Sequence, residues 1–309
     1  MGTATELSPL FMKIAILSQK PRIYSTQRLK QACEQRGHDA RILAPLDFSL
    51  LLQEGKPDLR YRNKRLGAFD GVILRVGPSL TFFGAAIVRQ FEQMGVYCLN
   101  SSLGITTARD KLCSMQLLSR QKIGIPYSAF ISRSSPALPV IEDIGGAPVV
   151  IKLLGGSQGI GVILAETDKM AEAVIQTLHS TQQNVLIQKF IAESKGRDMR
   201  AFVVGGKVVA AMRRIAQGDE YRSNIHCGGQ AEKISLNPEY EKLAIHATQI
   251  IGLNVAGVDI LESNDGPKIL EVNASPGLEG IEAATGVDVA SEIVKFLEEN
   301  ILIPQLTSH

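Results

Sequence analysis

The sequence predicts an α/β chain with a parallel sheet in its N-terminal part and an α+β C-terminal part that is built on antiparallel hairpins. In the first hundred residues, short apolar runs alternate with helical stretches, which is typical of the strand and helix units of a parallel sheet. In the remainder, pairs of aliphatic runs are separated by only a few turn residues, as in hairpins. With 309 residues, of which 45% are hydrophobic, the chain is long enough for two or three domains.

Composition and charge exclude several classes of protein. The net charge is +2, so nothing requires a nucleic acid or an anionic membrane as partner. The four cysteines form no CxxC pair, which argues against a zinc site or a disulfide framework and favours a reducing, cytoplasmic setting. No apolar run approaches the roughly 20 residues that span a bilayer. Residues 1–11 lack the features of a signal peptide, and we expect a loose N-terminal extension there.

Strands and helices alternate in the N-terminal part. Short aliphatic runs predict strands at residues 13–18, 39–43, 69–75 and 95–99. Ser25 or Thr26 can cap a helix that runs to Arg36 and ends at Gly37. A second helix is expected over residues 81–94.

Two segments depart from this alternation. The basic segment 53–65 is expected to be an exposed loop insertion. Residues 101–121 have helical periodicity and form a connector that ends at Gly124-Ile-Pro126. Lys111, in this connector, could reach a phosphate, although a lysine on a helix is more often a solvated side chain.

The chemically most informative stretch consists of two strand-like runs late in the chain, 255–261 and 268–273, separated by turn formers. Side chains alternate across a strand, so Glu271 and Asn273 project from one face, and a turn in the middle of the break places Asp259 opposite Glu271. Two carboxylates and an amide between apolar neighbours require a cation, and an all-oxygen donor set suits Mg²⁺. The alternative is a solvated hairpin face with incidental acids.

A glycine-rich segment, Gly155 to Gly161, lies between two further strand-like runs. Four glycines in seven residues predict a hairpin tip whose amides can approach a phosphate closely. It is not a Walker loop, since Val162 stands where a lysine is required, and a dinucleotide motif would join a strand to a helix. Lys152, inside the preceding apolar strand, favours the phosphate interpretation because a buried ammonium needs an anionic partner. The alternative is a glycine turn without a ligand.

The rest of the chain is interpreted from its periodicity and turn residues. The end of a strand at 185–191 is a plausible hinge for adenine binding. The loop 218–229 is too polar for a core element, and Arg222 and Asn224 in it can bind phosphate or carboxylate oxygens. We also expect helices at 168–180, 238–251 and 287–300, and a hairpin at 199–212 with a Gly205-Gly206 turn.

Together, these features describe a Mg-ATP site between two antiparallel sheets. Phosphoryl transfer needs neutralising cations and a lid that excludes water, and it needs little covalent chemistry from the protein. No Ser/His/Asp or Cys/His signature competes, and five scattered histidines make a histidine-based mechanism unattractive.

The order and spacing of these residues resemble the ATP-grasp ligases. The shared set comprises Lys152, Gly155 to Gly161, Gln188 to Ile191, Arg222-Ser-Asn224, Asp259 and Glu271-Val-Asn273. Within that group, residues 109–121, 159–167 and 273–282 are similar to the RimK-type ligases, which add glutamates to the C-terminus of ribosomal protein S-six. The resemblance covers about residues 12–301.

The resemblance implies an ATP-grasp fold that is preceded by a parallel α/β pre-ATP-grasp domain. The implied parts are an N-terminal extension over 1–11, the pre-ATP-grasp domain over 12–100, a helical connector and central subdomain with the glycine-rich lid over 101–187, and a C-terminal ATP-grasp domain with the metal site over 188–309.

The resemblance also implies roles for single residues. The nucleotide contacts would come from Lys111, Lys152, Gly156, Ser157, Gln158, Gly159, Gln188, Lys189, Phe190, Asp198, Arg222, Ser223 and Asn224. Two Mg²⁺ or Mn²⁺ ions would be held by Asp259, Glu271 and Asn273. Candidates to stabilise the transferring phosphoryl group or to hold glutamate are Arg200, Arg214 and Arg222. The hinge commonly reads Gln-Glu-Tyr-Ile in this family, so the lysine at position 189 puts a side-chain contact with adenine in question.

The implied activity is ATP-dependent ligation of L-glutamate to a carboxylate. The acceptor would be the C-terminus of ribosomal protein S-six, or a glutamyl peptide, activated as an acyl phosphate with release of ADP and phosphate. The enzyme would be a cytoplasmic homotetramer without nucleic-acid or membrane partners. Two alternatives remain: a carboxylate-amine ligase for another small carboxylate or cofactor, and a nucleotide-binding module without turnover.

Overall fold

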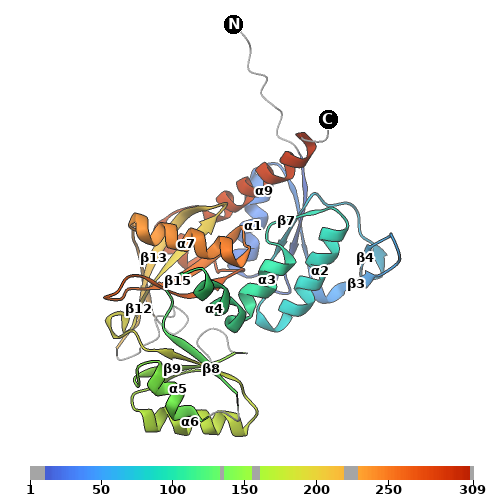
Figure 1. The fold of residues 1–309 in the computed structure, drawn as a ribbon. Helices are drawn as coiled ribbons and strands as arrows, with labels where there is room; N and C mark the ends of the chain where they lie inside the picture. The colour runs from blue at the N-terminus through green and yellow to red at the C-terminus, as the bar shows by residue number, and fades with distance from the viewer. Residues whose placement is uncertain (1–10, 133–135, 155–160, 219–228, 307–309) are drawn as a thin grey trace. The chain divides into compact units, whose positions relative to one another are not determined.

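The computed structural model describes residues 11–132, 136–154, 161–218 and 229–306. These residues divide into two compact units, which are described separately (Figure 1). Unit 1 comprises the described parts of Met1–Thr106, Gly252–Val255 and Ala274–His309, and unit 2 comprises those of Thr107–Ile251 and Ala256–Asn273. No helix in the described ranges is long and apolar enough to cross a membrane.

Unit 1 is built on a parallel sheet with the strand order β2-β1-β6-β7. The strands are β1 (Lys13–Leu17), β2 (Asp39–Leu43), β6 (Gly71–Leu74) and β7 (Tyr97–Cys98). Every residue of β6 and the last four residues of β1 are buried. Such continuously apolar strands are typical of a parallel sheet that is covered on both faces. The predicted N-terminal parallel sheet is therefore confirmed.

The helices of unit 1 come from both ends of the chain. They are α1 (Tyr24–Gln35), α2 (Thr81–Gln93), the first turns of α3 (Ser102–Arg109), α8 (Glu279–Thr285) and α9 (Val289–Leu306), with the 3-10 turns η1 (Pro45–Asp47) and η2 (Pro78–Leu80). Gly37 follows α1 with a φ of 86°, as predicted for its end. The predicted cap is wrong, because Ile23 stands at the N-cap and the hydroxyls of Ser25 and Thr26 are buried against tertiary partners.

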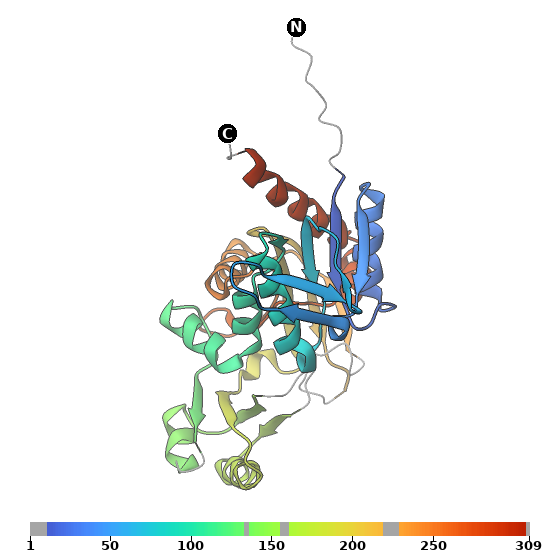
Figure 2. The same cartoon turned by 90° about the vertical axis from the view of Figure 1, so that its right-hand side faces the viewer.

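The segment between β2 and β6 carries a small antiparallel sheet (Figure 2). Its strands are β3 (Phe48–Leu51), β4 (Asp58–Tyr61) and β5 (Lys64–Arg65). The prediction of an exposed loop over 53–65 is therefore wrong for Asp58–Tyr61 and Lys64–Arg65, which form strands. Leu59 is fully buried, and Tyr61 packs against the core of unit 1. The basic residues that suggested a loop instead occupy the outer side of the strands.

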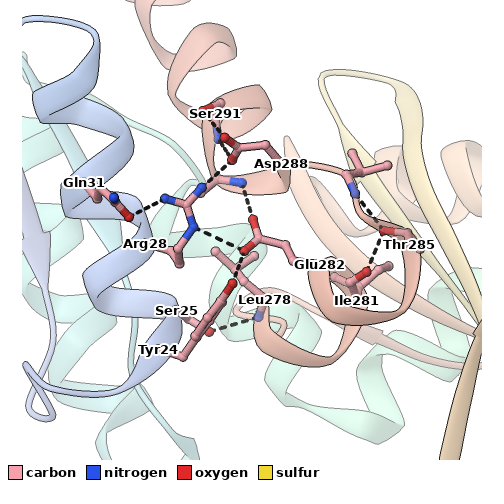
Figure 3. Close-up of polar contacts among 12 residues, drawn as sticks. Tyr24, Ser25, Arg28, Gln31, Leu278, Ile281, Glu282, Thr285, Asp288 and Ser291 are labelled. Carbon is pink, nitrogen blue, oxygen red and sulfur yellow. Dashed lines mark hydrogen bonds and ion pairs between the residues drawn. The ribbon is translucent and has the colours of Figure 1, made fainter.

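A polar network joins the N-terminal helix of unit 1 to its C-terminal helices (Figure 3). The carboxylate of Glu282, in α8, accepts hydrogen bonds from the Tyr24 hydroxyl at 2.8 Å and from the Ala290 amide at 2.9 Å. Arg28 lies 3.5 Å from Glu282 and donates to Asp288 at 2.7 Å. These contacts hold α1, α8 and α9 together, because removing any one partner leaves a poorly hydrated charge.

Unit 2 contains an antiparallel sheet in the order β10-β9-β11-β8. Helices α5 and α6 share one apolar core with this sheet. The elements are β8 (Ser128–Ile131), β9 (Val149–Leu153), β10 (Val162–Ala165), β11 (Val185–Lys189), α5 (Ala137–Asp143) and α6 (Asp168–Ser180). The hairpin predicted on either side of the glycine-rich segment is confirmed by the antiparallel pairing of β9 with β10.

A second sheet of unit 2 has the order β14-β13-β12-β15-β16. Its strands are β12 (Arg197–Val204), β13 (Lys207–Ile215), β14 (Gln230–Lys233), β15 (Val255–Leu261) and β16 (Lys268–Asn273). The predicted hairpins β12-β13 and β15-β16 are both confirmed. Helix α7 (Pro238–Ile251) and the 3-10 turn η3 (Ala192–Ser194) complete the described part of this region.

The predicted helical connector is two helices. Helix α3 ends at Arg109, and α4 spans Lys111–Arg120. Asp110 between them adopts an extended conformation, and its side chain accepts a hydrogen bond from the Cys113 amide at 2.9 Å. This is N-cap geometry, so Asp110 starts a new helix with Lys111 at its first position.

Replacing Gly104 by alanine should destabilise unit 1. A Cβ at this position would lie 2.2 Å from the carbonyl oxygen of Gly252. Backbone must move to relieve this overlap, at a cost of roughly 1–3 kcal/mol in the free energy of unfolding. Gly67→Ala is the control, since its Cβ would meet no atom within 4 Å. Equal urea midpoints for the two variants would contradict the close contact.

The Glu298 carboxylate should stabilise the protein above about pH 4 and lose this effect in acid. Burial raises its pKa, but hydrogen bonds from Arg36 and His38 outweigh burial, so the pKa lies below its usual value. A depressed carboxylate pKa stabilises the folded state above the unfolded pKa, about 4.3, and this stabilisation disappears as pH falls through the folded pKa. Glu298→Gln should therefore lower the melting temperature at pH 7 and approach the wild type near pH 3. The exposed Glu299→Gln should show no such pH dependence.

Candidate functional site

A row of charged side chains crosses the second sheet of unit 2. Arg214 lies on β13, Asp198 and Arg200 on β12, Asp259 on β15 and Glu271 on β16. The register pairs Asp198 with Arg214 and Asp259 with Glu271. The predicted pairing of the two acids is thus confirmed. Because neighbouring strands supply them, the alternating charges lie side by side along the sheet.

The centre of this row is Asp259, which is only 4% exposed. Arg200 binds it in bidentate geometry, with Nε to Oδ1 at 2.6 Å and Nη2 to Oδ2 at 2.7 Å. Arg214 adds a contact at 2.9 Å to Oδ2. Burial raises the pKa of Asp259, but the two arginines outweigh it and hold the pKa below its usual value. The carboxylate is therefore ionised and fixed in orientation.

Arg214 is the most enclosed cation of the row, at 4% exposure. Besides Asp259, it binds Asp198 through two parallel hydrogen bonds of 2.6 and 2.5 Å. Burial lowers its pKa, but Asp259 and Asp198 together raise it above the usual value. The resemblance implies a nucleotide contact for Asp198 and a contact with the phosphoryl group or glutamate for Arg214. In this structure their charged groups bind each other, which fits a supporting role for both.

Two lysines from other elements act on the acidic pair. Lys152 of β9 is half-buried, and burial lowers its pKa to about 8, although Glu271 and Asp259 oppose this shift. Lys111, at the start of α4, also has a lowered pKa because of burial, and Glu271 again opposes the shift. The structure therefore brings together both predicted phosphate-binding lysines and the two predicted metal-binding acids. A polyanion bound here would restore the charge that burial disfavours.

The donor set of the predicted metal site fits a hard cation in its chemistry. Asp259 and Glu271 supply carboxylate oxygens, and Asn273 lies two residues beyond Glu271 on β16. The amide nitrogen of Asn273 is buried and has no hydrogen-bond partner among the described residues, and the amide oxygen is the atom that a hard cation would take. No three His, Cys, Asp or Glu side chains gather elsewhere in the described ranges to offer a competing metal site. Mg²⁺, which prefers oxygen donors, is the ion that this set suits.

The predicted adenine hinge contains a lysine whose side chain is already engaged. Lys189 Nζ donates to the carbonyl oxygens of Gly145 and Gly146 at 2.7 and 2.8 Å. The Phe190 amide donates to the Pro148 carbonyl at 3.2 Å. Lys189, the residue that departs from the family pattern, therefore links the hinge to the residues that follow α5. Its side chain is used for this link, and we assign it no contact with adenine.

Gln188, on β11, is 2% exposed. Its amide nitrogen donates to the Ser128 hydroxyl at 2.8 Å, while its buried Oε1 has no partner. A cavity of about 560 Å³ borders the same hinge, and its lining includes Tyr127, Lys189 and Phe190. It is lined by neither the acidic pair nor Lys152, so it is separate from the row of charges.

Part of the predicted site lies outside the described residues. This holds for the glycine-rich lid and for the polar loop after β13, namely Gly156, Ser157, Gln158, Gly159, Arg222, Ser223 and Asn224. Sequence reasoning overlooked one buried cation in unit 1, Arg75, which directly follows β6. An arginine at the carboxyl end of an apolar strand was the available signal.

Comparisons with known proteins identify the family of the chain. Residues 12–105 match the family model of the RimK PreATP-grasp domain, and residues 108–297 match that of the RimK-like ATP-grasp domain. The probable alpha-L-glutamate ligase of Rhodopirellula baltica is 57% identical over 295 residues, covering 96% of this chain and 73% of that protein. That of Thioalkalivibrio sulfidiphilus is 52% identical over 289 residues, covering 94% of this chain and 96% of that protein.

Solved structures share the fold at low identity. The ATP-grasp ligase PsnB, complexed with a phosphomimetic precursor variant, Mg and ADP, has a TM-score of 0.72 at 19% identity, covering 97% of this chain and 100% of that one. A RimK domain protein from Sphaerobacter thermophilus has a TM-score of 0.69 at 23% identity, covering 92% and 99%. The predicted α/β ATP-grasp fold and the class of ATP-dependent ligase are confirmed. The chain belongs to the RimK-like ATP-grasp family.

Proposed function

We propose that this protein joins L-glutamate to a terminal carboxylate of a peptide or protein, with hydrolysis of ATP to ADP and phosphate. The relatives at 52–57% identity are named probable alpha-L-glutamate ligases, which supports glutamate as the amine. The observation that carries the proposal is the position of Asp259 opposite Glu271, with Lys152 interacting electrostatically with both acids and Lys111 with Glu271. This arrangement suits a triphosphate bound with a divalent cation. Without these ligands, the two acids and the two lysines would stay desolvated at a cost in free energy.

In the proposed reaction, an acceptor carboxylate oxygen attacks the γ-phosphorus of ATP. The bond from that phosphorus to the bridging oxygen breaks, and ADP leaves. The glutamate amine then attacks the carbonyl carbon of the acyl phosphate, the carbon–oxygen bond to phosphate breaks, and the amine loses a proton as the amide forms. A Mg²⁺ ion held by Asp259, Glu271 and Asn273 would offset the charge of the phosphates.

The side chains of the site take different parts in this proposal. Lys111 and Lys152 bind phosphate oxygens, which stabilises charge that moves between them during transfer. Arg200 and Arg214 orient Asp259, so we assign them a positioning role in place of direct contact with the phosphoryl group. Arg222, Ser223 and Asn224 remain candidates for contacts with phosphate or glutamate.

The finer features follow the family resemblance. We propose the C-terminus of ribosomal protein S-six as the acceptor, with a glutamyl peptide as a simpler substitute. We also propose two metal ions per site, Mn²⁺ as a possible replacement for Mg²⁺, a homotetrameric assembly and a cytoplasmic location. Light scattering on the purified protein tests the assembly directly.

Glu271→Gln should abolish most of the ligase activity. The change keeps the size of the side chain but removes a charge opposite Asp259, and loss of such an electrostatic contribution costs on the order of 10²–10³ in kcat. Purified protein is incubated with Mg-ATP, L-glutamate and a peptide ending in glutamates. Mass spectrometry should show products spaced by one glutamyl residue for the wild type.

Glu262→Gln, on the same hairpin, is the matched control and should retain activity within about twofold. Its carboxylate is 41% exposed and contacts only Arg213 among the described ion pairs. Full activity of the Glu271 variant would exclude the acidic pair from the reaction. ADP release by the wild type without glutamyl products, across several acceptors, would exclude glutamate ligation.

Nucleotide affinity should weaken as pH rises through about 8. The pKa of Lys152 is lowered to about 8, and only its protonated form attracts phosphate. Binding raises that pKa, so Kd should grow by at most about tenfold per pH unit above 8. Calorimetry with a nonhydrolysable ATP analogue between pH 7.5 and 9.5 measures this. Lys152→Arg should remove the pH dependence of the nucleotide Kd. Lys169→Arg, a change at an exposed lysine, is the control and should preserve it. An identical pH dependence of Kd in both variants would rule out Lys152 as the titrating group.

A further inference from the structure

Arg75 occupies a ligand-binding position in the sheet of unit 1. It directly follows β6, which pairs with β1 on one side and β7 on the other. Its amide donates to the carbonyl oxygen of Leu17, the last residue of β1. Arg75 therefore stands at the carboxyl edge of two neighbouring parallel strands. In open α/β sheets, ligands bind at this edge.

The guanidinium of Arg75 is desolvated and has no counter-charge among the residues that the structure describes. Its Nε is buried and has no hydrogen-bond partner, and no described side chain forms an ion pair with it. Burial lowers its pKa to about 10, and no carboxylate offsets that shift. The residue as a whole is half-buried, so part of it stays accessible. An unpaired guanidinium in such surroundings is costly, and a carboxylate is its best-matched partner.

The polar groups around Arg75 are already used. The Asn100 amide nitrogen donates to the carbonyls of Val255 and Ala274, and its oxygen accepts from the amides of Asn254 and Val255. The cavity between these residues and Arg75 measures about 10 Å³, which holds one water at most. Among the described residues, none is left to accept a hydrogen bond from Nε of Arg75, which leaves the accessible side of the guanidinium for a ligand.

The surrounding edge suits an acidic ligand. Lys20 and Arg22 are exposed in the loop that follows β1. The acids Glu282 and Asp288, which approach α1 from the C-terminal helices, are engaged by Tyr24 and Arg28 (Figure 3). They are therefore not free to neutralise this loop.

The chain that follows Asn273 runs along the same edge. The Ser275 hydroxyl donates to the carbonyl of Leu74, next to Arg75, at 3.1 Å. The Leu278 amide donates to the Ser25 hydroxyl at 2.9 Å (Figure 3). Arg75 thus lies beside the segment that begins directly after the last predicted metal ligand in the sequence.

We propose that Arg75 binds a carboxylate group of a glutamyl substrate, either free L-glutamate or the acidic end of the acceptor peptide. The choice of a glutamyl ligand rests on the proposed function, whereas the carboxylate chemistry rests on Arg75 itself. The competing explanation is structural: one trapped water satisfies Nε, and the arginine only fills space between the sheet and its neighbours.

The test compares Arg75→Met and Arg75→Lys with Arg89→Met, an exposed arginine of α2 in the same unit. L-glutamate and the dipeptide L-glutamyl-L-glutamate are titrated into each protein by calorimetry. Arg75→Met should weaken binding of one of the two ligands about 10- to 100-fold, the loss expected for a charge-assisted contact. Lysine should recover only part of this, because it cannot bind in bidentate geometry. Arg89→Met should change neither Kd by more than about twofold.

The ligand that loses affinity identifies the source of the carboxylate. Binding of a nonhydrolysable ATP analogue should be unchanged in all variants. The melting temperature of Arg75→Met without ligand should equal or exceed that of the wild type, because a desolvated unpaired charge is removed. A clear fall in melting temperature together with lost binding would support the structural explanation and overturn the proposal.

Failure of this inference is distinguishable from failure of the proposed function. If the wild type makes glutamyl products and Arg75→Met binds both ligands normally, the carboxylate site is excluded while ligation stands. If neither ligand binds the wild type, the site is likewise excluded. If a glutamyl ligand binds through Arg75 but no ligation occurs, the inference holds and the proposed reaction does not.

Discussion

The structure of the site depends on the burial of Asp259 opposite Glu271. Two carboxylates on paired strands repel each other, and removing them from water adds a desolvation cost of several kcal/mol per ion. Arg200 and Arg214 offset this cost on one side of Asp259 through three short contacts. Lys111 and Lys152 interact electrostatically with Glu271. The sheet therefore holds Asp259 ionised and oriented beside Glu271, which suits a divalent cation and a triphosphate.

Support for these acids extends across the sheet. Arg214 reaches Asp259 while it is also bound to Asp198, so β13, β12 and β15 share one chain of charges. The side chains of such a network keep one conformation only if every charge is paired, because one unpaired buried charge strongly raises the free energy of the folded state. This explains why two arginines that resemble phosphate ligands in the sequence are used to orient a carboxylate. Arg75 contrasts with them, since its buried Nε has no hydrogen-bond partner in the part of the chain that the structure describes.

Much of the fold and the acidic pair could be predicted because they depend on short-range rules. Strand alternation and a short break were enough to place Asp259 opposite Glu271, and the glycine turn at Gly205-Gly206 was enough to predict β12 and β13. The partner of Asp198 could not be predicted in this way. A bulge between Phe202 and Val203 shifts the register, so Asp198 faces Arg214 where a regular hairpin would pair it with Arg213.

Other errors have a similar physical origin. The hydroxyls of Ser25 and Thr26 resemble helix caps in sequence, but tertiary partners bind them. The basic residues of 53–65 obscured a strand in which Leu59 is buried and Tyr61 packs against the core. In each case a long-range contact outweighs a local preference. The assignments to Arg222, Ser223 and Asn224 rest on resemblance and stay predictions.

The central claim is that Asp259, Glu271 and Asn273 hold a divalent cation against a bound triphosphate. Its most direct test is a crystal grown with Mn²⁺ and a nonhydrolysable ATP analogue, measured at a wavelength where manganese scatters anomalously. An anomalous peak within about 2.0–2.4 Å of oxygens from these three side chains and of phosphate oxygens is the result expected. A bound nucleotide whose manganese peak lies away from Asp259 and Glu271 would contradict the account.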